Sequence, residues 1–300
     1  IEVRALQKHF VVRQKQAGHR LVREKKIVRA LDGVNFSIER GELIGYIGPN
    51  GAGKSTTVKI LSGILTPDGG EATVGGLIPW KERKKHVARI GVVFGQRTQL
   101  WWDVAPEESY KLLRDIYRVP KDKYDKRLKE LTEELQLNEF IRTPLRQLSL
   151  GQRMRAELAG SLLHDPELLY LDEPTIGLDA VSKLALRDFL RRENEKRGTT
   201  ILLTTHDMED ISALCYRVMV LGHGKLLYDG ALSALVSRYD TRRIVRVRYQ
   251  AGAKLPELPP CCLSREEDGA YCIDYAPGEI PTANLIEILQ RAPIAELTAQ

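Results

Sequence analysis

The segment Gly48–Thr56 constrains the fold of this 300-residue chain more than any other part of the sequence. It reads GPNGAGKST, which fits the pattern GxxxxGK[ST]. The run Leu43–Ile47 before it is short and apolar, as a buried strand is, and Ser55–Leu65 after it has a helical pattern. A glycine-rich loop between a strand and a helix predicts an α/β fold built on a largely parallel sheet.

The residue types of this loop suit the binding of a triphosphate. Glycines let the backbone wrap a phosphate with its N–H groups pointing inward, and the following helix adds the partial positive charge of its N-terminus. Lys54 would place an ammonium against the β- and γ-phosphates, and the Ser55 hydroxyl can ligate Mg²⁺. The predicted nucleotide-binding residues are Gly48, Pro49, Asn50, Gly51, Ala52, Gly53, Lys54, Ser55 and Thr56.

A second apolar run, Leu168–Leu171, ends in Asp172 and Glu173. A buried strand would deliver both acids to the carboxyl edge of the sheet, where ligands of open α/β sheets bind. Asp172 would hold Mg²⁺ directly or through its water, and Glu173 would orient and deprotonate the attacking water. An isolated strand that ends in two acids is more often an ordinary strand terminus, so this interpretation depends on the loop at Gly48.

Other candidate residues follow further predicted elements. His206 comes after the predicted strand Thr200–Thr204, where a neutral imidazole could hydrogen-bond the γ-phosphate. Gln96 follows the predicted strand Ile90–Phe94 and could reach Mg²⁺ and the water through its amide oxygen. Ser149 stands at the N-cap position of a predicted helix, which is either an ordinary capped helix or a second phosphate-binding helix end.

The pattern along the chain predicts two domains. Residues 1–239 alternate strands and helices, with a charged, helical insertion at about 104–165, and residues 240–300 read as a small α+β extension. No apolar run approaches the roughly 18 residues of a membrane-spanning helix, so we expect any membrane link to run through a partner. The four cysteines follow no metal-ligand spacing, and reduced thiols are expected.

The net charge of +6 is concentrated locally. The segment Arg13–Arg29 holds seven basic residues against the single acid Glu24. This segment is either a solvated basic hairpin or a region attracted to anionic lipid headgroups. Aromatic residues do not interleave with the charges as in a single-strand binder, so nucleic acid is not an expected partner.

Together these motifs closely resemble the ATPase subunits of ABC transporters, from about Glu2 to Tyr239. GPNGAGKST is similar to the Walker A motif, LLYLDEP at Leu168–Pro174 is similar to Walker B, and LSLGQ at Leu148–Gln152 matches the signature motif. Gly177-Leu178-Asp179 resembles the D-loop.

The resemblance implies roles for individual residues. The catalytic residues would be Glu173, His206 as the switch histidine and Gln96 as the Q-loop glutamine. Phe10 would stack on adenine. The metal ligands would be Ser55, Gln96 and Asp172, and ATP and Mg²⁺ would be the cofactors. The implied fold is a P-loop core with a mixed sheet, an antiparallel β subdomain, an inserted helical subdomain and the C-terminal extension.

It also implies partners and a place in the cell. Two subunits, expected to be identical, would meet head to tail, so that Ser149, Gly151 and Gln152 complete the partner's site in trans. Transmembrane permease subunits would contact Gln96–Asp103, which contains Trp101 and Trp102; the alternative for these tryptophans is a simple core pair. The chain would lie at the cytoplasmic side of the cell membrane, held there by its permease.

The subtype most resembles ATPase subunits of drug-, viologen- or polysaccharide-exporting systems. Two departures from the family pattern stand out: Leu150 replaces the usual glycine of the signature, and the basic segment Arg13–Arg29 lengthens the connection between the first strands. The alternatives are a soluble ATPase of the same superfamily that acts on nucleic acid or ribosomes, and a regulatory subunit that binds ATP without turnover. Intact Lys54, Asp172, Glu173 and His206 argue against the second.

Overall fold

The structure is a computed structural model that describes residues 1–15, 23–95, 98–239, 243–250, 253 and 255–299. The chain divides into two compact units, Ile1–Leu232 and Ser233–Gln300, and each is described by itself. The sequence places the boundary after Tyr239, whereas contacts group the helix α8 (Leu232–Tyr239) with the second unit.

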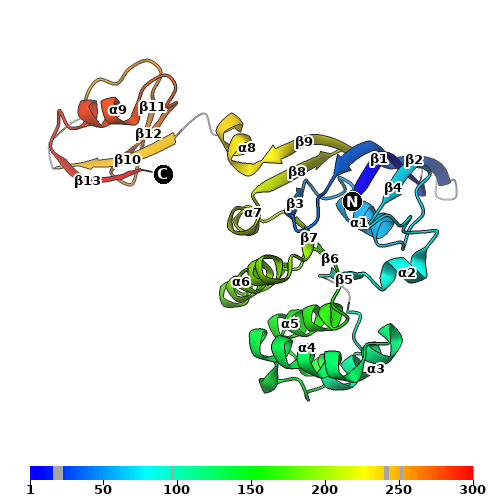
Figure 1. The fold of residues 1–300 in the computed structure, drawn as a ribbon. Helices are drawn as coiled ribbons and strands as arrows, with labels where there is room; N and C mark the ends of the chain where they lie inside the picture. Colours follow the sequence, from blue (N-terminus) through cyan, green and yellow to red (C-terminus); the bar gives the residue numbers. More distant parts are fainter. Residues whose placement is uncertain (16–22, 96–97, 240–242, 251–252, 254, 300) are drawn as a thin grey trace. The chain divides into compact units, whose positions relative to one another are not determined.

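A six-stranded sheet forms the centre of the first unit (Figure 1). In sheet order its strands are β5 (Ile90–Phe94), β6 (Leu168–Asp172), β7 (Thr200–Thr205), β3 (Leu43–Ile47), β8 (Arg217–Gly222) and β9 (Lys225–Ala231). The first five are parallel and β9 is antiparallel to β8. Their apolar runs are buried because helices and a second sheet cover the two faces.

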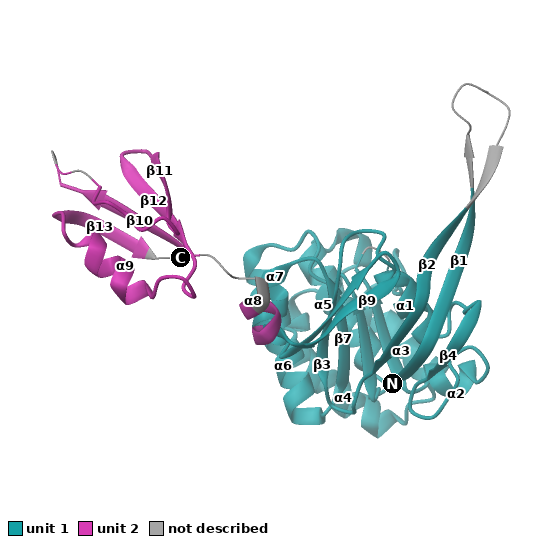
Figure 2. Cartoon of the chain, turned by 90° about the horizontal axis from the view of Figure 1, so that it is seen from above, with its two compact units in different colours: residues 1–232 teal, residues 233–300 magenta. Residues whose placement is uncertain are grey.

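The second sheet is antiparallel and consists of β2 (Arg23–Ser37), β1 (Glu2–Lys15) and β4 (Gly69–Thr73). Its inner side chains and those of α1 (Lys54–Leu61) pack against the central sheet in one apolar core. Strand β1 is longer than the predicted Glu2–Phe10, and its pairing with β2 continues to Lys15 opposite Arg23. The basic segment is therefore built partly into a hairpin of the first unit (Figure 2), and its tip lies outside the described residues.

The remaining helices of this unit cover the sheet and form the inserted helical subdomain. The helices are α2 (Arg83–Val87), α3 (Pro106–Tyr117), α4 (Lys121–Glu134), α5 (Leu150–Leu162), α6 (Ala180–Arg197) and α7 (Met208–Leu214), with short 3₁₀ turns at Leu137–Glu139 and Leu145–Gln147. A buried ion pair between Arg127 of α4 and Glu193 of α6, at 2.6 Å, ties the helical insertion to the core. The mixed sheet, antiparallel sheet and helical insertion confirm the predicted fold class.

The second unit contains a four-stranded antiparallel sheet and a helix. The elements are β10 (Arg243–Tyr249), β11 (Leu263–Glu267), β12 (Ala270–Tyr275), α9 (Thr282–Leu289) and β13 (Ile294–Ala299), with sheet order β11-β12-β10-β13. Val245 and Val247 of β10 pack with Leu285 and Leu289 of α9 in a core of its own. The helix covers one face of this sheet.

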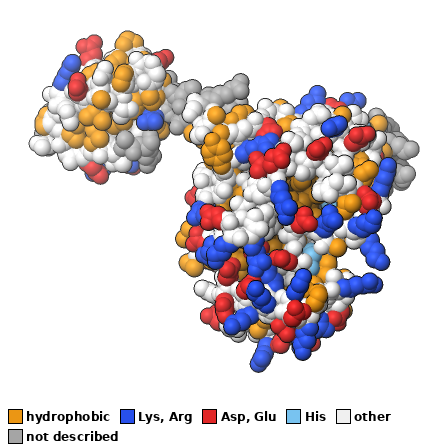
Figure 3. Space-filling view, viewed as in Figure 1, with side chains coloured by type: hydrophobic (Ala, Val, Ile, Leu, Met, Phe, Trp, Pro, Cys, Tyr) orange, Lys and Arg blue, Asp and Glu red, His pale blue; other side chains and the backbone are white. Residues whose placement is uncertain are grey.

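Two findings bear on how the chain could contact a membrane or another molecule. Within the described residues no helix is long and apolar enough to cross a membrane. On the face drawn in Figure 3, acidic and basic side chains of the first unit are interspersed, so the described residues there present no extended field of one sign.

Candidate nucleotide site

The loop Gly48–Thr56, here called the nucleotide cradle, connects β3 to α1 as predicted from the sequence. Gly48 has φ 155° and Gly53 has φ 112°, values that favour glycine. A Cβ atom on Gly48 would lie 2.2 Å from the carbonyl oxygen of Leu221, and one on Gly53 would lie 2.4 Å from that of Ala30. The backbone of the cradle is therefore held against neighbouring strands in a shape that side chains at these positions would prevent.

Lys54 begins α1 and turns its ammonium back over the cradle. Its side chain is 5% exposed, and Nζ donates hydrogen bonds to the carbonyl oxygens of Gly48 at 2.6 Å and Pro49 at 3.2 Å. Because carbonyl oxygens hold the ammonium at the mouth of the loop, a positive charge lies where phosphate oxygens would enter. The cradle residues thus fit a polyphosphate.

Asp172 ends β6 and joins three segments of the chain. Its Oδ1 accepts hydrogen bonds from Ser55 Oγ at 3.0 Å and from Thr204 Oγ1 at 2.6 Å. Carboxylate and hydroxyl oxygens are the donors that Mg²⁺ prefers, and Mg²⁺ is commonly shared between one or two carboxylates and substrate phosphates. The described residues contain no cluster of three or more His, Cys, Asp or Glu side chains suited to a metal.

Glu173 has its backbone fixed in an uncommon conformation. Its φ is 55°, and its N–H donates to the carbonyl oxygen of Thr204 at 2.9 Å and to Thr204 Oγ1 at 3.1 Å. A Cβ on Gly95 would lie 2.1 Å from the carbonyl oxygen of Glu173, so glycine is needed beside it. Strain of this kind persists only where surrounding contacts hold it, and it is common at functional sites.

The carboxylate of Glu173 lies between Lys54 and His206, the two side chains predicted from the sequence to contact the γ-phosphate. Its Oε1 is 3.8 Å from Lys54 Nζ, and its Oε2 is 3.4 Å from His206 Nδ1. The structure therefore brings together the cradle, the end of β6 and the segment after β7 at one edge of the sheet. Thr204 was missed in the sequence, although its position opposite Asp172 in the parallel register of β6 and β7 could have indicated it.

A second network links this edge to α6. Arg187 of α6 donates from Nε to Asp210 Oδ1 at 2.6 Å, and the Thr175 hydroxyl donates to Asp210 Oδ2. Asp210 is fully buried on α7, four residues beyond His206, while Thr175 lies in the loop after Glu173. The loop of Glu173 and the segment of His206 are therefore clamped to the same helix.

An ion pair reinforces this clamp directly beside His206. Lys183 Nζ of α6 donates to Asp207 Oδ2 at 2.6 Å, and this hydrogen bond lowers the pKa of Asp207 from its ordinary value. Neither the Arg187–Asp210 pair nor the Lys183–Asp207 pair was predicted, because no local sequence pattern pairs residues of α6 with residues at the start of α7.

The signature end, Ser149–Gln152, is built differently from the cradle. Ser149 accepts a hydrogen bond from the Gln152 backbone N–H at 3.2 Å, and the Gln152 side chain accepts one from the Ser149 N–H at 2.9 Å, which is a capping box. A Cβ on Gly151 would lie 2.4 Å from Ser182 Oγ of α6, so this glycine allows close packing within the chain. No described hydrogen bond or ion pair connects Ser149 to the cradle.

The remaining predicted residues lie at the surface or outside the described part. Gln96 is not among the described residues, so its predicted place in the site stays untested. Phe10 is 38% exposed on β1, with Lys8 Nζ 5.8 Å from its ring centroid. Trp101 and Trp102 are both exposed, which contradicts the core-pair alternative, and the Arg153 guanidinium lies 4.5 Å from the Trp102 ring centroid.

Comparison with known proteins decides the family. Residues 31–176 match the model of the family described as ABC transporter. The ABC transporter ATP-binding protein NatA of Bacillus subtilis is 32% identical over 232 residues, which cover 77% of this chain and 93% of NatA. The chain belongs to the ABC transporter ATP-binding proteins.

Other similar members of this family include resistance proteins. The linearmycin resistance ATP-binding protein LnrL of Bacillus subtilis is 34% identical over 75% of this chain and 70% of LnrL. The daunorubicin resistance ATP-binding protein DrrA3 of Streptomyces coeruleorubidus is 36% identical over 77% of this chain and 73% of DrrA3.

Solved structures of ABC cassettes share this fold. The dimeric post-hydrolysis structure of the ATP-binding cassette MJ0796 with ADP and Pi has a TM-score of 0.66 and 27% identity over 77% of this chain and 98% of that one. Cassettes of this family are ATPases that form dimers and work with membrane permeases. This ABC protein is accordingly an ATPase subunit of a membrane transporter complex.

Proposed function

We propose that this ABC subunit hydrolyses ATP with Glu173 as general base and His206 as the group that contacts the γ-phosphate. The carboxylate of Glu173 between Lys54 and His206 carries this proposal, because it puts an acceptor for the proton of water beside two groups suited to phosphate. The backbone N–H of Glu173 donates hydrogen bonds to Thr204, which hold the residue in place. Little entropy is therefore lost in orienting its carboxylate at the moment of reaction.

The other residues bind and orient the substrate. The cradle N–H groups and Lys54 would hold the β- and γ-phosphates, and Phe10 would stack on the adenine ring. Ser55 and Asp172, together with Gln96, would hold Mg²⁺, which neutralises phosphate charge when it is bound. The contact of Ser55 with Asp172 at 3.0 Å supports this, since both oxygens already lie side by side.

A second copy of the chain would complete the site. The signature end places Ser149, Gly151 and Gln152 at a capped helix N-terminus, where an anion is favoured, and Ser149 there is exposed. Within the described residues it has no partner in the cradle of its own chain. Head-to-tail pairing would bring Ser149 and the N–H groups of this helix to the γ-phosphate held by the other copy.

The Glu173→Gln variant tests the assignment of the base. Loss of the general base should lower kcat by about 10²–10⁴-fold, while ATP stays bound and the dimer becomes more stable. Single-turnover hydrolysis and gel filtration with Mg·ATP would measure both effects. Hydrolysis by Glu173→Gln at the parent rate would show that another residue is the base.

The proposed direction of transport is export. LnrL and DrrA3 are named as resistance proteins, and this supports an exporter. Two other relatives are named energy-coupling factor transporter ATP-binding proteins, at 32% and 34% identity, so the test must measure direction itself. With its own permease in inside-out vesicles, an exporter accumulates substrate inside when ATP is added outside, whereas an importer does not.

The β1–β2 hairpin is the proposed contact with anionic lipid headgroups beside the permease. Val11, Val12, Ile27 and Val28 are exposed apolar residues on the paired strands, within or directly before the basic segment Arg13–Arg29. Apolar area together with basic charge favours an anionic membrane surface. Charge reversal within residues 13–29 should weaken binding to phosphatidylserine vesicles, and unchanged binding would leave the segment as a solvated hairpin.

A further inference from the structure

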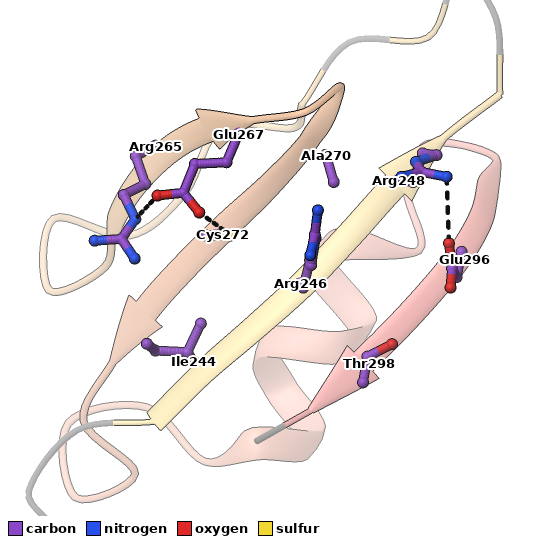
Figure 4. Close-up of a pocket in the computed structure, with 9 residues that line it drawn as sticks. All are labelled: Ile244, Arg246, Arg248, Arg265, Glu267, Ala270, Cys272, Glu296 and Thr298. Atoms are coloured by element: carbon purple, nitrogen blue, oxygen red, sulfur yellow. Dashed lines mark hydrogen bonds and ion pairs between the residues drawn. The ribbon is translucent and has the colours of Figure 1, made fainter.

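The four-stranded sheet of the second unit has one face that no element of that unit covers in the described structure. Val245 and Val247 of β10 are fully buried against α9. Because side chains alternate along a strand, the intervening Arg246 and Arg248 project from the opposite face. Figure 4 shows them rising from β10 on the side away from the helix.

This open face is hollowed along β12. In the strand register Cys272 lies between Arg246 of β10 and Arg265 of β11, and Ala270 follows on the same face. Ala270 and Cys272 are 1% and 7% exposed, so short side chains form the floor while long ones on both neighbouring strands form the walls. The resulting trough has a volume of about 340 Å³, within the roughly 300–1,000 Å³ of small-molecule sites.

Among the described residues, the charges that line the trough include one arginine without an acidic partner. Arg265 Nε donates to Glu267 Oε1, with 2.8 Å between them, and Arg248 Nη1 lies 3.5 Å from Glu296 Oε2. Arg246 has no acidic partner among the described residues. Three arginines against two glutamates give the lining a net charge of +1. Figure 4 shows Arg246 between these two pairs, so a guanidinium with no described acidic partner stands over the trough.

We propose that the trough binds a small organic anion whose carboxylate or phosphate group is held by Arg246. A guanidinium matches such oxyanions with two parallel hydrogen bonds, and the Arg246 donors are available for them. The Ala270 and Cys272 floor is apolar and suits the carbon skeleton of the ligand. The binding site lies wholly in the second unit and is independent of ATP hydrolysis.

Titration of the full-length ¹⁵N-labelled chain with citrate, and separately with inorganic phosphate, tests this proposal. Mg·ADP is present throughout, because the nucleotide cradle also binds phosphate. Saturable changes in the amide signals of β10 and β12 are expected with at least one anion, and the tighter anion tells a carboxylate ligand from a phosphate ligand. Failure of both anions to saturate would overturn the proposal.

Two variants and a matched control make the test specific. Arg246→Ala should weaken binding by about tenfold or more, since charge-assisted hydrogen bonds are lost. Arg243→Ala removes the same charge from the same strand but lies on the opposite face in the alternation, so parent affinity is expected. Cys272→Leu fills the trough without changing charge and should also abolish binding. Equal affinity of Arg246→Ala and Arg243→Ala, or parent affinity of Cys272→Leu, would contradict the site.

Discussion

The nucleotide cradle and the signature end differ in how the chain supports them. In the cradle, Lys54 is buried and Asp172 accepts hydrogen bonds from both Ser55 and Thr204, so residues far apart in sequence fix one another. At the signature end, Ser149 is exposed and Gln152 is half-buried, and their described side-chain hydrogen bonds are with each other. One region is assembled by the fold of a single chain, whereas the other presents a helix end that a partner can use.

The two regions therefore differ in which contacts hold their residues in position. Residues of the cradle keep their geometry through contacts with β2, β6 and β8, so a change in those contacts should disturb chemistry and stability together. Residues of the signature end keep their geometry through a local helix cap, so a change there should disturb association with little effect on the fold.

The largest expected effect is that of Asp210→Asn on stability. Removal of the buried carboxylate leaves the Arg187 guanidinium with only the exposed Glu209, 3.5 Å away, which costs about 3–5 kcal/mol in the free energy of unfolding. Urea unfolding of the parent and the variant measures this cost. Asp188→Asn on α6, which removes an exposed carboxylate 3.8 Å from Arg191, serves as the control and should change stability by about 0.5 kcal/mol or less.

Equal stability losses in the two variants would show that the clamp between α6 and α7 does not hold the site. If Asp210→Asn folds, its kcat should fall more than its nucleotide affinity, because the displaced segments carry Glu173 and His206. A loss of affinity alone would contradict that link.

Lys54→Ala should weaken ATP binding by roughly 10–150-fold, because one charge-assisted interaction with phosphate is worth about 1.5–3 kcal/mol. Equilibrium dialysis with ATP measures the affinity. Lys59→Ala removes a cation from the same helix α1 outside the cradle, and its affinity should match the parent. Unchanged affinity in Lys54→Ala would remove the assignment of the cradle as the phosphate site.

The smallest expected effect on stability is that of Ser149→Ala, at about 1 kcal/mol from the lost helix cap. Its ATP-driven dimerisation should nevertheless be lost in the Glu173→Gln background. Ser149→Asp separates the two roles, because aspartate keeps the cap but places a negative charge where the γ-phosphate would lie. Normal dimerisation of Ser149→Asp would contradict the role of this serine in trans.

Mixing Lys54→Ala with Ser149→Ala sharpens the comparison further. In a head-to-tail dimer of the two, the intact cradle of one chain meets the intact signature end of the other. The mixture should therefore bind ATP in a dimer although neither variant does so alone. No gain on mixing would argue that both regions act within one chain.

The local motifs were enough to predict the cradle because the sequence pattern that marks it is short-range. A strand, a glycine-rich turn and a helix follow one another at Leu43–Leu61, and Lys54 donates to carbonyl oxygens only five and six residues before it. The mixed sheet and helical insertion were predicted for the same reason, since each element has its own hydrophobic period. The lengths of β1 and β2 were not predicted, because strand pairing across the basic segment is a long-range contact.

The sequence by itself determined the strand–loop–helix cradle, the acids at the end of β6, the capped signature helix and hence the family. Only the tertiary structure decided that Thr204 holds both Asp172 and Glu173, and that Asp210 joins α7 to Arg187 and Thr175. It also decided that Arg246, which has no acidic partner in the described part of the chain, stands over a trough in the second unit. These contacts join residues separated by many positions, and their partners are chosen by packing and strand register, which no local pattern of residues encodes.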